Sequence, residues 1–399
     1  MRGLYRYLSP FTPDQSGALS VLFELGGLVV ICDAGGCAGN VCGFDEPRFY
    51  SKKSAVFSAC LRDMDAIMGR DDRLIEKTGK ALASFPEAKF IAYIGTPVPS
   101  VIGTDFRALK RMAEKQFHLP VVTCATNGMD SYDKGEEKAY RALIDTFACG
   151  SGLSSAEHVP FAGVWGATPL ELAAPGSAEL IRNGFTEDGV PVVTFGMDSM
   201  LDDVRRCGSA AVNYAVSPAG LAAVQYLQQK YGTEYYVVSP LYRTHGKNAG
   251  AGSRPSNADD SAADKTESYV SGGMPHPLTG PVLVVHQQFM ANAVRGIIRA
   301  SCRSLPSGAP ETDVATFFDF APGYAEQGDS RPAGEDEFIS LVKNKGYRTI
   351  IADPLLARAL PGFDGTFIPL PHFAVSGQLH AVRSEAEFLE PLYRELGRV

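Results

Sequence analysis

Three cysteines stand five residues apart, directly after the apolar run at residues 27–31: Cys32, Cys37 and Cys42. The run is typical of a buried strand. The segment behind it contains four glycines, and we expect a loop that brings backbone N–H groups and thiolates close to a bulky ligand. Because soft metals prefer thiolates, Cys37 and Cys42 are candidate metal ligands. Cys32 is expected to be a packed thiol, and the alternative is that all three thiols only pack.

The composition restricts the setting in which these thiols act. A chain of 399 residues is expected to form two or three domains. The 37 Lys and Arg residues against 45 Asp and Glu residues give a net charge of −8 without a basic tract, which argues against nucleic-acid binding. No run has the length of a signal peptide or membrane span, so we expect a cytoplasmic protein without a membrane partner. Eight irregularly spaced cysteines then indicate metal or redox use for a few of them.

Strand-like and helix-like segments alternate along the chain, which predicts parallel α/β layers. We expect a first α/β unit with the cysteine loop and a dimer interface at residues 1–152, a second at 153–245 and a third at 281–399. Residues 246–280, most of which lack large apolar side chains, are interpreted as a flexible linker or lid. The predicted strands are 27–32, 89–95, 120–124, 161–165, 191–195, 211–216, 234–238, 282–285, 314–318, 349–351 and 366–369. The predicted helices are 71–84, 104–117, 136–149, 218–231, 289–303, 335–345 and 385–396.

Several short motifs follow one another at a characteristic spacing. They are Ala34-Gly35-Gly36-Cys37, the segment 58–70, Thr96-Pro97 before Ile102-Gly103-Thr104-Asp105, Ala211-Val212-Asn213-Tyr214, and Lys230-Tyr231-Gly232. In this order they resemble the component 1 subunits of nitrogenase-like oxidoreductases. That family includes nitrogenase molybdenum-iron protein subunits, light-independent protochlorophyllide reductase and a reductive cyclase of tetrapyrrole coenzyme synthesis. The resemblance covers nearly the whole chain and implies three tandem Rossmann-like units with parallel sheets.

The resemblance implies an iron-sulfur cluster at the interface between paired subunits. Family subunits supply three cysteines each to a larger cluster, but here only Cys37 holds such a position, and Ser9 and Thr96 stand at the other two. A four-iron four-sulfur (4Fe-4S) cluster takes four thiolates, so Cys37 and Cys42 from two chains would complete one. Cys60, in the neighbouring segment, is the reserve ligand or else a packed thiol.

The same resemblance implies a function. The Cys and His that anchor the large catalytic cofactor of nitrogenase fall here at Ser217 and near Pro371, so we do not expect a nitrogenase in the narrow sense. We expect a reductase component that receives electrons from an ATP-dependent iron-sulfur reductase dimer and reduces an unknown small molecule. Its partner subunit is identical or paralogous, and a second metallocofactor is left open. The alternatives are a scaffold that binds or assembles a metallocofactor or tetrapyrrole without turnover, and a cluster-free small-molecule binder.

Candidate substrate-site residues lie at predicted strand ends. His286 and His372 are candidate catalytic residues, because imidazole exchanges protons near neutral pH, and structural hydrogen bonding is the alternative. The candidate cofactor contacts are Gly35, Gly36, Gly39, Asn213 and Ser217. A phosphate-binding turn is disfavoured, because the third glycine of the dinucleotide fingerprint is not at its required spacing.

Overall fold

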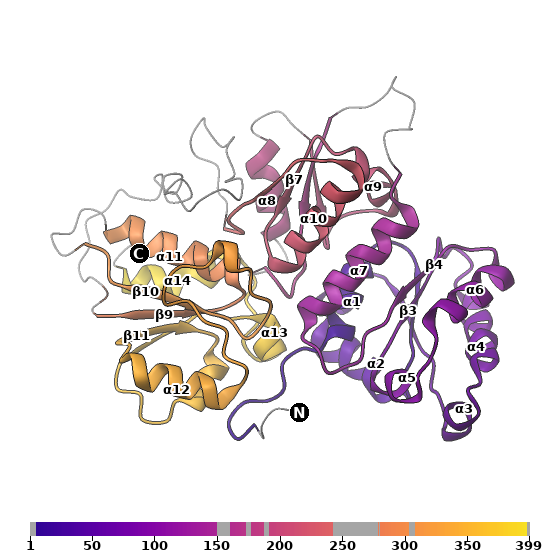
Figure 1. The fold of residues 1–399 in the computed structure, drawn as a ribbon, viewed down its shortest axis with the longest axis horizontal. Coiled ribbons are helices and arrows are strands. Elements are labelled where there is room, and N and C mark those ends of the chain that lie inside the picture. The colour runs from indigo at the N-terminus through magenta and orange to yellow at the C-terminus, as the bar shows by residue number, and fades with distance from the viewer. Residues whose placement is uncertain are drawn as a thin grey trace.

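The computed structural model describes residues 5–149, 160–172, 177–186, 191–241, 278, 280–302 and 308–396. These residues form three α/β units, each around a four-stranded parallel sheet (Figure 1). Counted along each unit, the strand order is 2-1-3-4 in all three sheets. This repetition confirms the predicted fold class of three tandem Rossmann-like units with parallel sheets. The predicted linker or lid at 246–280 falls outside the described residues, apart from Leu278 and Gly280.

The first unit has helices on both faces of its sheet. Alternate side chains explain this: Val29 and Ile31 join the core under one pair of helices, whereas Leu28 and Val30 join the core under the other pair. The sheet has the order β2 (Ala55–Ser58), β1 (Leu28–Ile31), β3 (Ile91–Ile94), β4 (Val121–Cys124). Helices α1 (Asp14–Leu22) and α7 (Tyr132–Phe147) cover one face, and α4 (Asp71–Ser84) and α6 (Phe106–Phe117) the other. The shorter helices are α2 (Gly36–Asn40), η1 (Val41–Asp45), η2 (Pro47–Tyr50), α3 (Asp63–Met68) and α5 (Pro97–Ile102).

The second unit packs closely on the long helix α7 of the first (Figure 1). Its sheet has the order β6 (Val192–Phe195), β5 (Ala162–Trp165), β7 (Val212–Ala215), β8 (Tyr235–Val237), and its helices are α8 (Ser177–Thr186), α9 (Leu201–Arg206), η3 (Cys207–Ser209) and α10 (Pro218–Tyr231). Helix α10 begins as predicted, with Pro218 in its first turn and the Ser217 hydroxyl accepting from the Gly220 N–H at 3.1 Å. A Cβ at Gly220 would lie 2.2 Å from the Trp165 carbonyl oxygen, so only glycine lets α10 approach β5 this closely.

The third unit also holds the N-terminal segment of the chain. The backbone N–H groups of Arg6, Tyr7 and Leu8 donate to the Glu335 carboxylate at 2.8 to 2.9 Å. The sheet has the order β10 (Thr312–Ala315), β9 (Val282–Val285), β11 (Thr349–Ala352), β12 (Thr366–Pro369). The helices are α11 (Gln288–Cys302), η5 (Pro322–Tyr324), α12 (Glu335–Lys345), η6 (Pro354–Ala359), α13 (Phe373–Ser376), η7 (Gly377–His380) and α14 (Glu385–Glu395).

Most sequence-predicted elements are confirmed to within two residues, including α4, α10 and α12 at their predicted bounds. Helix α7 differs most, since it begins four residues before the predicted start at residue 136. Strand β2 and helices α1 and α8 were not predicted from the sequence. Strand β2 is a half-buried edge strand and every residue of α1 is buried, so the sequences of these two elements lack a regular alternation of polar and apolar residues. No helix in the described part of the chain is long and apolar enough to cross a membrane.

Candidate functional site

The segment that carries Cys37 and Cys42 is helical, so the prediction of an open glycine loop is wrong. Gly35, at φ 115°, turns the chain, which then continues as α2 and the π-helix η1. The glycines of this segment have a low helix propensity. The buried Asp33 carboxylate nevertheless accepts a hydrogen bond from the Ala38 N–H at 2.8 Å, which stabilises the first turn of α2. Cys37 lies in α2 and Cys42 in η1, and both are half-buried. Single π-helical turns are uncommon and often lie at functional sites.

Cys60 lies beside this segment. Strands β1 and β2 are parallel neighbours, so their carboxyl ends open toward the same edge of the sheet. The Cys60 Sγ is 3.7 Å from the place that a Cβ at Gly35 would take, and the side chain is exposed. At φ 45°, Cys60 adopts a left-handed conformation that residues other than glycine rarely adopt. The segments that carry Cys37, Cys42 and Cys60 therefore follow the carboxyl ends of two neighbouring strands, on the same edge of the sheet.

Asp33 connects the segments that carry these thiols. Its buried carboxylate accepts from the Ser58 hydroxyl at 2.6 Å as well as from the Ala38 N–H. Burial and then the charge of Asp33 raise the pKa of the Cys37 thiol. Burial, Glu46 and Asp33 raise the pKa of the Cys42 thiol. A bound metal would offset this effect, because a cation favours the thiolate that coordinates it.

The thiols on this segment do not form a complete metal site within the described part of the chain. Among the described residues, no group of three or more His, Cys, Asp or Glu side chains is placed to hold a metal ion. A Cβ at Gly36, Gly39 or Gly43 would meet nothing within 4 Å, so the surface beside the thiols is open. Thr96, at a position where the resemblance led us to expect a cysteine, lies within hydrogen-bonding reach of the Cys37 thiol. Thiols are the ligands that iron-sulfur clusters take, and the three at this edge of the sheet are fewer than the four that a 4Fe-4S cluster needs.

The remaining cysteines divide between the interior and the surface. Cys32 is buried as predicted, Cys124, Cys207 and Cys302 are buried too, and burial raises the pKa of Cys124 and Cys207 to about 12. Cys149, the last residue of the helix predicted at 136–149, is exposed, because α7 ends at Phe147 and the chain leaves the core there.

A second cluster of polar side chains is buried where the three units meet. The Tyr132 hydroxyl, on α7, donates to Glu171 Oε2 at 2.9 Å and lies 3.3 Å from His372 Nε2. The same ring nitrogen is 3.0 Å from the Leu170 carbonyl oxygen. The rings of His286 and His372 stack with their centroids 3.9 Å apart. The structure therefore brings the two predicted catalytic histidines together, at one end of a hydrogen-bonded chain.

The two histidines differ in their partners. His286 Nδ1 accepts from the Gln287 N–H at 2.8 Å, and its Nε2 lies 3.4 Å from the Pro371 carbonyl oxygen. His372 Nδ1 is buried without a hydrogen-bond partner. Burial lowers the pKa of His286 to about 3, and burial together with His286 lowers the pKa of His372 well below its usual value. Both rings are therefore neutral near pH 7, and His372 has the unused ring nitrogen.

Asn213 and Ser217, predicted to contact a cofactor, are both engaged within the protein. Asn213 Oδ1 accepts from the Trp165 indole N–H at 2.8 Å, and its amide donates to Thr233 at 3.1 Å. Ser217 caps α10, and a Cβ at Gly166 would lie only 2.0 Å from its hydroxyl oxygen. Ser217 has a tightly packed hydroxyl group where a metal ligand would need a thiolate. Asn213 and Ser217 therefore do not fit a second metallocofactor bound at this position.

Sequence reasoning missed Glu136 and Glu171, two fully buried carboxyl groups beside Tyr132. Glu136 Oε1 accepts from the Thr168 hydroxyl at 2.6 Å, and Glu171 accepts from Tyr132. A signal for Glu136 was present in the sequence, since it lies on the buried stripe of α7 between Tyr132 and Tyr140 at helical spacing. A charged residue in an apolar stripe indicates a buried polar site.

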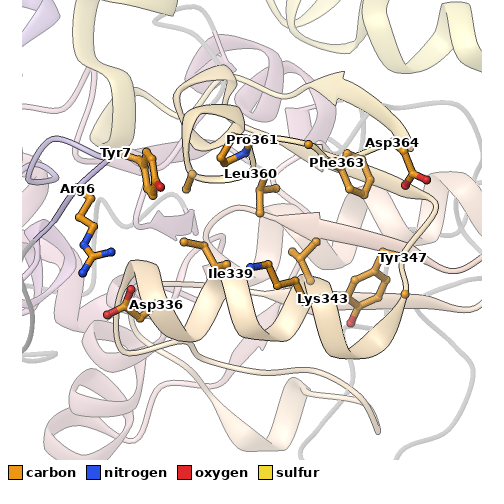
Figure 2. A pocket seen from close by; sticks show the side chains of 14 residues that line it. Arg6, Tyr7, Asp336, Ile339, Lys343, Tyr347, Leu360, Pro361, Phe363 and Asp364 are labelled. Carbon is orange, nitrogen blue, oxygen red and sulfur yellow. The ribbon is translucent and has the colours of Figure 1, made fainter.

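A separate hollow of about 450 Å³ lies on the third unit. Figure 2 shows it between Arg6 and Tyr7 of the N-terminal segment, helix α12 and the turn that carries Phe363. Its lining includes two basic side chains, Arg6 and Lys343, and two acidic ones, Asp336 and Asp364, and none of the predicted site residues lines it.

Comparison with known proteins places the chain in a family. The family model described as nitrogenase component 1 type oxidoreductase matches residues 14–245, more than half of the chain. A solved structure titled "Nitrogenase Cp1 at pH 6.5" superposes with a TM-score of 0.68 at 11% identity, over 99% of this chain and 93% of that chain. A second, "Nitrogenase Cp1 at pH 5", gives 0.61 at 12% identity, over 99% and 88%. No curated protein matches the chain. The structural likeness shows the fold, and the family match shows that the chain belongs to the nitrogenase component 1-type oxidoreductases.

Proposed function

We propose that this chain is the electron-accepting component of a nitrogenase-like reductase, paired with an identical or paralogous chain through its first unit. The observation that carries the proposal is that Cys37 and Cys42 follow β1 and Cys60 follows the neighbouring β2, at the same edge of the sheet and beside glycines that face open space. Two thiols are too few for a 4Fe-4S cluster, and two chains related by a twofold axis supply four.

Exposed apolar side chains around the thiols support such an interface. Phe44, two residues after Cys42, is 63% exposed, and Tyr50 is 75% exposed. Leu379 on η7 is 72% exposed, and η7 packs against η1 from the third unit. Large apolar side chains gathered beside an incomplete metal site indicate a surface that a protein partner covers. A second component 1 chain is the partner that also supplies the missing thiols.

The residues of this chain have definite tasks in the proposed site. When bound, the cluster supplies a store for single electrons. Cys37 and Cys42 would bind the cluster, and Cys60 is the alternative ligand. Asp33 fixes the position of α2 relative to the end of β2, because its carboxylate accepts hydrogen bonds from the Ala38 N–H and the Ser58 hydroxyl. Lys77 donates to the carbonyl oxygens of Ala59 and Cys60 at 2.8 and 2.9 Å, which holds the strained turn at Cys60 in place.

Electrons would come from a separate ATP-hydrolysing iron-sulfur reductase and would reduce a small molecule held at the junction of the units. The test mixes the anaerobically purified dimer with such a reductase and measures ATP hydrolysis and reduction of the iron. ATP-dependent reduction of the iron supports a reductase. Bound iron or tetrapyrrole without electron transfer would support the scaffold alternative instead.

A further inference from the structure

The hollow on the third unit lies between helix α12, the N-terminal segment and the turn at residues 360–364 (Figure 2). Asp336, Ile339 and Lys343 line it from α12, and residues at this spacing lie on one face of a helix. Its volume of about 450 Å³ is within the range of small-molecule sites. Neither the candidate thiols nor the candidate histidines line the hollow, so any task it has is separate from the proposed reductase function.

Hydrogen bonds hold the two segments that face α12. The buried Glu335 carboxylate accepts from the backbone N–H groups of Arg6 and Tyr7 at 2.8 and 2.9 Å. In the turn, the Phe363 N–H donates to the Leu360 carbonyl oxygen at 3.1 Å. The protein's own contacts therefore form the walls of the hollow, and a ligand does not have to order them.

The inner surface of the hollow is apolar and partly aromatic. The side chains that give it this character are Tyr7, Ile339, Val342, Tyr347, Leu360 and Phe363. The Tyr347 hydroxyl donates to Asp313 Oδ2 at 2.6 Å, outside the hollow, so Tyr347 contributes its ring to the lining. A flat apolar group fits this surface, because aromatic rings pack well edge-to-face or with an offset stack.

Charged side chains without partners gather at one end of the hollow. Figure 2 shows Arg6 and Asp336 at this end and Asp364 at the other. Lys343 leans toward Asp336, since helical side chains point toward the N-terminus of their helix. Among the residues that the structure describes, none of Arg6, Asp336 and Lys343 forms an ion pair. Glu335, an acidic group within electrostatic reach of Arg6, already accepts three backbone N–H groups.

We propose that the hollow binds a small aromatic zwitterion that carries both charged groups at one end, as an aromatic amino acid does. The carboxylate of this ligand binds between Arg6 and Lys343, and its ammonium group pairs with Asp336. The ring extends along the apolar surface toward Phe363. Burial of the ring supplies affinity, whereas the three charged side chains select a molecule with one group of each sign.

Calorimetric titration of the full chain with L-phenylalanine tests the site. Three further probes each lack one part of it: L-alanine lacks the ring, phenylacetate the ammonium group and phenethylamine the carboxylate. Each should bind at least about 10-fold more weakly than L-phenylalanine, because ring burial or a charged hydrogen bond is lost. Phenylacetate or phenethylamine that binds as tightly as L-phenylalanine would overturn the pairing of both charges, and no binding of L-phenylalanine would overturn the site.

Variants of exposed side chains locate the charged end of the ligand. Asp336→Asn and Lys343→Gln should each weaken L-phenylalanine binding by about 10-fold or more, and Asp336→Asn should leave phenylacetate binding unchanged. Asp364→Asn is the matched control, because it removes the same charge at the other end of the hollow and should bind L-phenylalanine like the unaltered chain. All three side chains are exposed, so these changes leave the core intact. Equal losses in Asp336→Asn and Asp364→Asn, or no loss in Asp336→Asn, would overturn the proposal. Binding should be the same in Cys37→Ser, so the outcome does not depend on the proposed cluster.

Discussion

The Ser58 hydroxyl donates to the Asp33 carboxylate at 2.6 Å, and this bond joins the two segments that carry the candidate thiols. Asp33 follows β1 and holds the first turn of α2 through Ala38, whereas Ser58 ends β2 and also lies 3.2 Å from the Cys60 Sγ. The hydrogen bond between Ser58 and Asp33 therefore helps to fix the positions of the thiols that follow β1 and β2.

Ser58→Ala should therefore lower iron content without abolishing it. A hydrogen bond to a buried charged group contributes about 1.5–3 kcal/mol, and its loss frees Cys60 while Cys37 and Cys42 remain. Iron per chain, measured after anaerobic purification, should fall by less than it does in Cys37→Ser. Ser340→Ala is the control, because Ser340 is exposed and bonds only to its own helix α12. Equal iron in Ser58→Ala and the control would refute the role of the bond.

Asn213→Ala should destabilise the second unit and leave iron binding intact. Both ends of the Asn213 amide are bonded inside the protein, and the Trp165 indole N–H loses its acceptor when the amide is removed. The cost of leaving one buried donor unpaired is about 1–3 kcal/mol. Trp165 is the single tryptophan, so its fluorescence reports the change directly. Loss of iron from a still folded Asn213→Ala variant would instead favour the predicted cofactor contact.

Stability should decrease as the pH falls below about 6.5. The pKa of His286 is about 3 in the folded chain against 6.5 for the free side chain, so the unfolded state binds more protons between these values. The contribution of the neutral His286 ring to folding stability is fully present above about pH 6.5, and it is lost progressively as the pH falls toward about 3. Lowering the pH from about 6.5 to about 5 should cost about 2 kcal/mol for this one residue. Denaturant unfolding of His286→Asn should show a shallower acid loss, and an unchanged slope would contradict the neutral, buried ring.

Stability should also decrease on the alkaline side. Burial raises the pKa of Glu171 from 4.5 to about 8, so the folded state binds more protons than the unfolded state in that range. This contribution is complete below 4.5 and is lost as the pH rises through about 8. Glu171→Gln removes the carboxyl group that titrates here and should flatten the fall of the melting temperature between neutral pH and about 8.5. A melting temperature that keeps its pH dependence in this variant would contradict a Glu171 carboxyl group that is protonated at neutral pH.

The sequence predicted the fold well where local signals are strong. Ser217 and Pro218 mark the start of α10, and the cap that Asp105 forms with Arg107 and Ala108 marks the start of α6. Local signals failed for α2, where glycines argue against a helix and the stabilising contact comes from the side chain of Asp33. The helix at Cys37 was therefore not predictable from its own residues.

The candidate sites show the same division. The cysteines could be identified from their spacing, and the left-handed turn that holds Cys60 next to Gly35 could not. The pair of Glu136 and Glu171 depends on how α7 packs against the second unit, and His372 reaches Tyr132 from the third. These contacts join residues far apart in the chain, whose mutual placement no local pattern encodes.

Iron and acid-labile sulfide in the anaerobically purified protein, with its mass in solution, test the central claim most directly. The account predicts a dimer with about four irons and four sulfides, since four thiolates hold one such cluster. Cys37→Ser and Cys42→Ser should each lose most of the iron, whereas Cys302→Ser, at a buried thiol of α11, should keep it. If Cys60→Ser loses iron and Cys42→Ser keeps it, the second cluster ligand is Cys60 instead of Cys42. An iron-loaded monomer, or full iron in Cys37→Ser, would contradict the cluster shared between two chains.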